Sequence, residues 1–116
     1  MTELVELRRD AAVAHLTMNA PGSLNALSDA MLAALSTRLS ELGADGSIRA
    51  IVLKGAGKAF CAGHDLKEMQ AGRQAADGGR GYFADLFARC GALMQLIPSL
   101  PQPVIAEVHG IATAAG

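Results

Sequence analysis

Residues 59–69 read AFCAGHDLKEM and follow an apolar run, IRAIVLK, at residues 48–54. The centre of this run is almost continuously apolar, which predicts a strand buried on both faces of a layered α/β fold. Asp65 is followed three residues later by Glu68, an acidic form of the capping box, so a helix should begin near Asp65. The backbone N–H groups of residues 63–66 would then be partly unpaired and would point outward.

A second segment has the same arrangement. Residues 104–108 (VIAEV) predict another buried strand, and the small residues TAAG at 113–116 follow at a place where a helix could begin. Small side chains let a polar atom of another molecule approach the backbone closely. Two N–H donors from different loops that converge on one point would form an oxyanion hole, where each donor contributes about 2.7–4 kcal/mol of transition-state stabilisation.

The N-terminal part of the chain predicts a β-hairpin. Residues 3–8 and 12–18 alternate apolar and polar positions, and Arg9 with Asp10 suits a tight connection between the two strands. The turn-forming residues at 19–23 then take the chain out of the sheet.

Two helices are expected between the later strands. Ser28 suits the N-cap of the first and Gly43 its C-terminal stop, with apolar residues at three- and four-residue spacing between them. The Gly- and Ala-rich tract 70–81 predicts a mobile surface loop, and a second helix should run from residue 82 to about residue 98. Strands that alternate with helices predict an α/β fold with parallel pairing between the later strands.

Composition places the chain among globular proteins with a single domain. It has 116 residues, of which 51% are hydrophobic and 18% charged, and its formal net charge is −1. A near-neutral charge argues against a nucleic-acid partner, and no apolar run reaches the ~18 residues that a membrane span needs. The N-terminus lacks the pattern of a signal peptide, and Cys61 and Cys90 have no ligand spacing. We therefore expect a cytoplasmic protein with two reduced thiols.

Competing motifs do not fit. In residues 55–60 (GAGKAF), Phe60 stands where a dinucleotide-binding GxGxxG needs its third glycine, and Ala59 replaces the Ser or Thr of a P-loop. The three histidines have no metal-ligand spacing, and no GxSxG elbow occurs. The sequence predicts neither a metal nor a separate cofactor.

The segment AFCAGHDLKEM resembles the F-x-A-G-x-D-[LI]-x-x-[ML] signature of the crotonase (enoyl-CoA hydratase/isomerase) superfamily. Three further stretches resemble the family in the right order: 19–27 its N-x-P…x-N-A-L loop, 48–53 the strand before the signature, and 101–110 its K-P-V-I-A-A-V-x-G strand. The detail of His64 resembles the enoyl-CoA hydratase domain-containing subgroup.

The resemblance implies a crotonase-like ββα spiral, an α/β fold, with residues 1–116 as the N-terminal part of an acyl-CoA-binding core domain. It implies that the backbone N–H groups of His64 and Ala115 form the oxyanion hole. The other residues expected to contact the substrate are Asp65, Leu66 and Lys67, with Ala26 and Ala62 as backbone contacts. Coenzyme A is then part of the substrate, and a homo-trimer or hexamer is the expected assembly.

Two departures from the family pattern bear on catalysis. The second loop reads Ala114-Ala115-Gly116 where the family usually has two or three glycines, and His64 stands where alanine is common. The two catalytic glutamates of the hydratases are expected beyond Gly116, so the chain is expected to end inside its second oxyanion loop. Three hypotheses remain: part of an enoyl-CoA hydratase or isomerase, an inactive acyl-CoA-binding or regulatory protein, or a fragment that folds only in an assembly.

Overall fold

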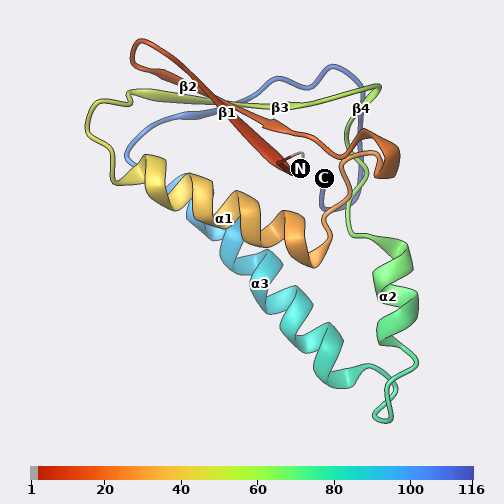
Figure 1. Ribbon diagram of the computed structural model, residues 1–116. Helices are drawn as coiled ribbons and strands as arrows, with labels where there is room; N and C mark the ends of the chain where they lie inside the picture. Colours follow the sequence, from red (N-terminus) through yellow and green to blue (C-terminus); the bar gives the residue numbers. More distant parts are fainter. Residues whose placement is uncertain (1–2) are drawn as a thin grey trace.

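The computed structural model describes residues 3–116, which form a twisted sheet with helices packed beneath it (Figure 1). In chain order the elements are β1 (Val5–Asp10), β2 (Val13–Met18), the 3₁₀ turn η1 (Pro21–Ser23), α1 (Asp29–Gly43), β3 (Ala50–Gly55), β4 (Ala59–Cys61), α2 (Leu66–Gly72), α3 (Arg80–Ser99), β5 (Val104–Ala106) and β6 (Ile111–Ala112).

The main sheet has the strand order β1-β2-β3-β5. β1 and β2 are antiparallel, whereas β2 pairs with β3, and β3 with β5, in parallel. The two parallel steps are connected through α1 and α3, as parallel neighbours require a crossover. The predicted α/β class and the parallel pairing of the later strands are confirmed.

The β1–β2 hairpin turns later than the sequence predicted. Arg9 and Asp10 lie within β1 and pair with β2, and the turn itself is made at Ala11 and Ala12. Ala11 has a φ of 53°, the left-handed conformation that two-residue hairpin turns require. Charged residues at the exposed end of a strand resembled a turn in the sequence.

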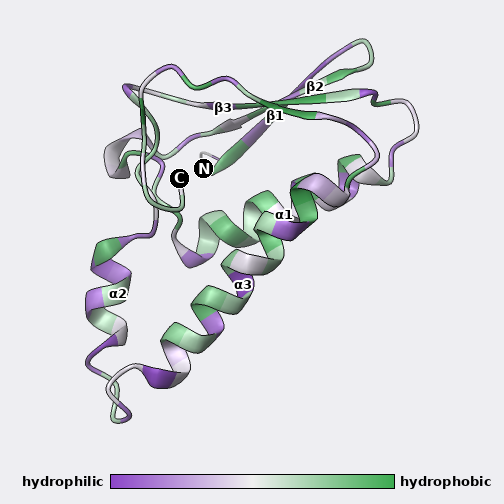
Figure 2. Cartoon of the chain, turned by 180° about the vertical axis from the view of Figure 1, so that it is seen from behind, coloured by the Kyte–Doolittle hydropathy of each residue, from purple (hydrophilic) through white to green (hydrophobic). Residues whose placement is uncertain are grey.

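Both long helices cover the same face of the main sheet, with hydrophobic and hydrophilic residues alternating along them (Figures 1 and 2). β3 lies in the interior of the sheet, as predicted, but the prediction that both its faces are buried is wrong. Ile51, on the helix side, is 0% exposed, whereas Val52 on the other face is only half-buried. The largest core side chains are Leu16, Met18, Met31, Leu32, Leu39, Leu42, Ile51, Leu86 and Leu93.

Helix α1 has the ends that the sequence predicted. The Ser28 side chain accepts a hydrogen bond from Met31 N at 3.0 Å, and the helix ends at Gly43. The buried Gln102, to which the sequence assigned no role, closes the other end. Its Nε2 donates to Leu42 O at 2.8 Å and to Ile48 O at 3.2 Å, so one carbonyl of the last turn of α1 and one of the loop after it have a donor.

The loop between α2 and α3 is shorter than the predicted tract 70–81. It spans residues 73–79, because both helices extend into the Gly- and Ala-rich sequence. The Asp77 carboxylate accepts from Gly81 N and Gly79 N, each at 2.9 Å, and these contacts lower the pKa of Asp77. Asp77 therefore caps the start of α3.

Two short parallel strands, β4 and β6, form a second sheet that the sequence did not predict. The predicted strand 104–108 is shortened to β5, although Glu107 N still donates to Leu53 O at 2.8 Å. The exposed Glu107 carboxylate lies 3.8 Å from Lys54 Nζ, just after the edge strand β5. Residues 113–116 form a tight turn, with no helix beginning there.

Within residues 3–116, no helix has the length and hydropathy needed to cross a bilayer. The same residues contain no cluster of three or more His, Cys, Asp or Glu side chains arranged to hold a metal ion. Both cysteines are buried as free thiols.

The Asp45 carboxylate should contribute to stability in a pH-dependent way. It accepts from Ser47 Oγ at 2.6 Å and Ser47 N at 2.9 Å and pairs with Arg9 at 2.8 Å, which together lower its pKa from 3.8 to about 2. A lowered folded-state pKa stabilises the fold fully above the ordinary value and loses that contribution as the pH falls towards 2. Asp45→Asn should therefore be less stable than the wild type at pH 6, with the difference shrinking between pH 4 and pH 2.

Urea denaturation across this pH range measures the effect. Ser47→Ala removes the hydrogen bond from the serine hydroxyl, which is the largest cause of the lowered pKa of Asp45. The stability difference between the wild type and Ser47→Ala should therefore show part of the same pH dependence. A stability difference between wild type and Asp45→Asn that stays constant from pH 6 to pH 2 would contradict the prediction.

Candidate active site

The loop 62–65 lies between β4 and α2 and is shaped by the cap of α2. Asp65 Oδ1 accepts from Lys67 N at 3.0 Å and from Glu68 N at 3.1 Å, so the predicted helix start at Asp65 is confirmed. The predicted capping role of Glu68 in the same helix is wrong. Its Oε1 accepts from Asp29 N, the first residue of α1, at 2.9 Å, because the Asp65 N–H already donates to Leu27 O at 3.4 Å.

The same loop is paired with the segment that precedes α1. Leu27 N donates to Gly63 O at 2.7 Å, and together with the bond from Asp65 N this makes an isolated parallel bridge between Leu27 and His64. Along a strand, alternate N–H groups point to opposite sides, so the N–H of His64 points away from Leu27. Among the described residues it donates no hydrogen bond.

The buried side chain of Asn25 holds this segment to the turn between β3 and β4. Its Oδ1 accepts from Ala20 N at 2.8 Å, and it is 0% exposed. Its Nδ2 donates to three carbonyl oxygens, at 2.9 Å on Ala56, 3.0 Å on Ala59 and 3.2 Å on Phe60. The sequence assigned no role to Asn25 beyond its place in the stretch 19–27, which resembles a loop of the family.

The second loop is attached to β4 through β6. Thr113 N donates to Cys61 O at 3.2 Å, and Gly116 N closes a turn on Thr113 O at 2.8 Å. Within the turn Ala114 has a φ of 53°. The N–H of Ala115 has no acceptor among the described residues.

Gly63 lets the two loops approach each other. Its φ is +91°, and a Cβ on Gly63 would stand 3.4 Å from Ala115 N and 3.0 Å from Thr113 O. The peptide after Gly63 carries the N–H of His64, so this N–H and that of Ala115, both without an acceptor among the described residues, are on neighbouring loops. Gly63 itself received no role in the sequence analysis, where it was one small residue among several.

A groove of about 290 Å³ runs along one side of this pair of loops. Six of the seven residues predicted to contact the substrate line it: Ala26, Ala62, His64, Asp65, Leu66 and Lys67. Leu66 is 77% exposed and Lys67 is exposed as well, so the groove opens to solvent on the side of α2.

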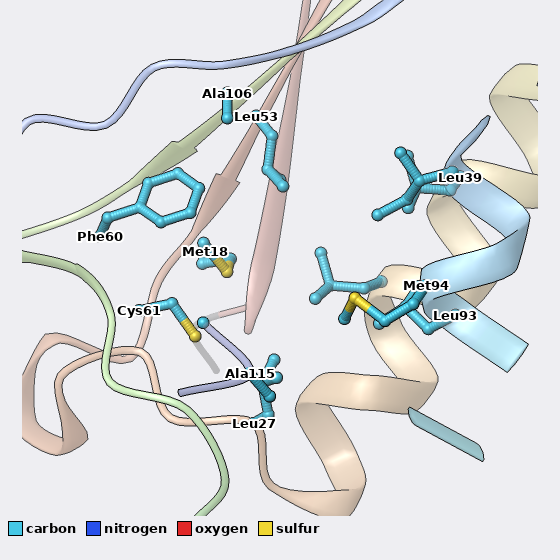
Figure 3. A pocket seen from close by; sticks show the side chains of 13 residues that line it. Met18, Leu27, Leu39, Leu53, Phe60, Cys61, Leu93, Met94, Ala106 and Ala115 are labelled. Carbon is cyan, nitrogen blue, oxygen red and sulfur yellow. The ribbon is translucent and has the colours of Figure 1, made fainter. Parts of the chain in front are cut away.

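The seventh predicted residue, Ala115, lines a separate apolar cavity of about 170 Å³ (Figure 3). Figure 3 shows Met18, Phe60 and Cys61 on the sheet side of this cavity and Leu93 with Met94 on the helix side. All its lining residues are apolar. The N–H of His64 thus belongs to a residue that lines the groove, and the N–H of Ala115 to a residue that lines the apolar cavity.

Two titratable side chains near the loops have no catalytic partner. The ring of His64 packs edge-on against Phe87, with centroids 5.8 Å apart, and its buried Nδ1 has no hydrogen-bond partner among the described residues. Burial raises the pKa of the Cys61 thiol, which keeps it protonated. Cys61 is 2% exposed and packs in the hydrophobic core.

Comparison with known proteins decides the family. The model of the family described as enoyl-CoA hydratase/isomerase matches residues 8–116. The chain belongs to this family. Enoyl-CoA hydratase domain-containing protein 3 of Xenopus laevis is 37% identical over 115 residues, which are 99% of this chain and 37% of that protein. The 1,2-epoxyphenylacetyl-CoA isomerase of Escherichia coli is 34% identical over 116 residues, covering 100% of this chain and 44% of the isomerase.

Solved members of the enoyl-CoA hydratase/isomerase family share the fold. An enoyl-CoA hydratase of Mycobacterium smegmatis superposes with a TM-score of 0.92 at 54% identity, covering 99% of this chain and 43% of that one. Human enoyl-CoA hydratase domain-containing protein 3 gives 0.87 at 33% identity, covering 97% and 43%. The crotonase-type fold and the predicted resemblance are confirmed, and the chain spans about two fifths of the length of these relatives.

Proposed function

We propose that this chain binds the thioester end of an acyl-CoA and holds its carbonyl oxygen between the N–H groups of His64 and Ala115. The observation that carries the proposal is the pair of unpaired backbone donors brought together at Gly63. When a proton leaves the α carbon or a nucleophile adds to the β carbon, negative charge develops on this oxygen. Two preformed donors favour that enolate, with about 2.7–4 kcal/mol for each donor.

The groove and the cavity suit different parts of such a substrate. The pantetheine arm of coenzyme A would lie in the groove along residues 62–67, with Lys67 able to reach a phosphate. The acyl chain would enter the apolar cavity beside Ala115, where burial of each methylene contributes about 0.8 kcal/mol. The E. coli and M. smegmatis relatives are named for reactions of CoA thioesters, which supports this class of substrate.

Proton transfer is assigned to residues outside 1–116. No carboxylate lines the apolar cavity, and Asp65 and Glu68 are occupied as helix caps. In keeping with the family resemblance, we propose that two glutamates beyond residue 116 act as general acid and base. The trimeric or hexameric assembly and the cytoplasmic location also remain predictions.

A second candidate function is acyl-CoA binding without turnover. It is favoured by the same absence of a carboxylate from the described lining of the cavity. Calorimetric titration with crotonyl-CoA, acetyl-CoA and free CoA, combined with a crotonyl-CoA hydration assay on a form of the protein that extends beyond residue 116, separates the two. Binding with turnover supports the hydratase, binding alone supports the second candidate, and absence of binding contradicts both.

Lys67→Glu should weaken CoA binding about tenfold at low salt, since reversal of one charge near a phosphate removes an attraction and adds a repulsion. The effect should shrink at high ionic strength, because Lys67 is exposed and its charge is screened. Arg49→Glu makes the same charge change at an exposed residue that does not line the groove, and it serves as the control. Equal losses in both variants would show that net charge, and not Lys67, governs binding.

A further inference from the structure

Helix α2 has an unusual mode of attachment. None of its residues is fully buried, and Met69, which is partly buried, is its one side chain that packs against the hydrophobic core. Its first residues nevertheless carry the loop that presents the His64 N–H. With so small an apolar anchor, the position of this N–H depends also on polar contacts made by α2.

One contact joins α2 to α1. Glu68 Oε1 accepts from Asp29 N at 2.9 Å. Asp29 is the first residue of α1, and its N–H is one of the donors that a helix cannot satisfy by itself. A carboxylate at this position also complements the positive end of the α1 dipole.

The same point is tied to α3. The Asp29 carboxylate accepts from Arg89 at 2.7 Å, and Arg89 Nε donates to Asp85 at 2.8 Å. These carboxylates raise the pKa of Arg89. At the other end of α2 the ring of Tyr82 lies directly against Gly72, where no side chain would fit. The N-terminal turn of α2 thus has Glu68 as its link to the α1–α3 pair.

We infer that Glu68 is a positioning residue, whose hydrogen bond to the first N–H of α1 fixes α2 and with it the His64 N–H. The two ends of this arrangement are already joined by the bridge between Leu27 and His64, one residue before the Ser28 cap. The hydrogen bond of Glu68 adds a second contact, after the loop. Two contacts, one at each end of the loop 63–66, prevent the loop from rotating about the Leu27 bridge.

The inference rests on the proposed function only in the use made of the His64 N–H, so its first test needs no ligand. The reporters are the amides of Asp65 and Met69, which donate to Leu27 O and Asp65 O. In Glu68→Ala we expect hydrogen exchange at both amides, followed by NMR, to be about tenfold faster, the equivalent of losing a typical helix cap. The Arg49 amide, bonded to Ala12 O at the other end of β2, should be unchanged.

Matched variants identify the hydrogen bond as the cause. Glu68→Gln keeps an acceptor for Asp29 N and should exchange like the wild type, whereas Glu41→Ala removes an exposed glutamate of α1 and should have no effect at either reporter. If Glu68→Ala does not fold, Glu68→Asp, which is one methylene shorter, takes its place with the same expectation. The inference would be overturned if the Asp65 and Met69 amides of Glu68→Ala, or of Glu68→Asp in its place, exchanged as in the wild type. It would also be overturned if Glu68→Gln behaved like Glu68→Ala.

A second measurement links the loop to the thioester. Glu68→Ala should lower the affinity for acetyl-CoA several-fold more than the affinity for free CoA, since only the thioester uses the His64 N–H. Faster exchange with equal loss of both affinities would keep the positioning role and contradict the oxyanion role of His64. The two failures are therefore distinguishable.

Discussion

Gly63→Ala is expected to lower the affinity of the chain for an acyl-CoA thioester by at least about tenfold, with a smaller loss for free CoA. The added methyl group would lie 3.0 Å from Thr113 O and from Ala114 Cβ. Such contacts are tight, so we expect the turn that carries Ala115 to shift by a few tenths of an ångström away from Gly63. Two oxyanion donors act together only when both reach one oxygen, and separation of the loops removes one of them.

The same substitution also strains the backbone. Gly63 has a φ of +91°, where a residue with a side chain is destabilised by about 1–2 kcal/mol. Gly78→Ala is the matched control, because Gly78 has a φ of +71° and nothing lies within 4 Å of its Cβ position. It should lose similar stability while leaving thioester affinity unchanged.

Urea denaturation and calorimetric titration of both variants measure the two effects separately. If Gly63→Ala and Gly78→Ala lose stability equally and bind acyl-CoA equally well, the two loops do not cooperate in binding. Loss of binding in Gly63→Ala alone would support the convergence of His64 and Ala115.

The sequence predicted the elements that follow from local periodicity. The Ser28 cap, the leucine stripe of α1 and the end of α3 near Pro98 all depend on residues within a few positions of one another, and the structure confirms them. The short strands β4 and β6 were not predicted. Each has only two or three residues and is defined by pairing with a partner about fifty positions away, which no local pattern reveals.

The candidate site divides in the same way. The cap at Asp65 is a local feature, and the sequence located it correctly. Glu68 was assigned to the same helix because its spacing fits a capping box, but the fold brings the N-terminus of α1 closer to it. The packing of α1 against α2 decides which unpaired N–H the Glu68 carboxylate accepts from. Glu68 and Asp29 are 39 positions apart, so the sequence carries no direct sign of their contact.

Asn25→Ala is expected to lower the free energy of unfolding by about 3–5 kcal/mol, the largest stability change among these predictions. The substitution removes an acceptor from Ala20 N and a donor shared by three carbonyls, one in the β3–β4 turn and two in β4. Asn25 is 0% exposed, so water cannot replace these contacts without opening the loop. Each buried polar group left without a partner costs about 1–3 kcal/mol.

Asn25→Asp separates hydrogen bonding from side-chain volume. A carboxylate of nearly the same size can still accept from Ala20 N but would place negative charge against the carbonyl oxygens of Ala56, Ala59 and Phe60. It should therefore be destabilised at neutral pH almost as strongly as Asn25→Ala, and should partly recover in acid, where the protonated group can donate again. Thermal unfolding at pH 7 and pH 4 measures both variants.

Asn19→Ala is the control within the same segment. The Asn19 side chain also makes hydrogen bonds, to Glu6 Oε1 at 2.6 Å and Glu3 O at 3.5 Å, but these are exposed and water can replace them. The stability lost in Asn19→Ala should be below about 1 kcal/mol.

Asn25 joins the segment that pairs with Gly63 to the turn before β4. Asn25→Ala should therefore also abolish acyl-CoA binding at temperatures where the rest of the sheet is still folded. Retained binding in a destabilised Asn25→Ala protein would show that the bridge between Leu27 and His64 is enough to hold the loop.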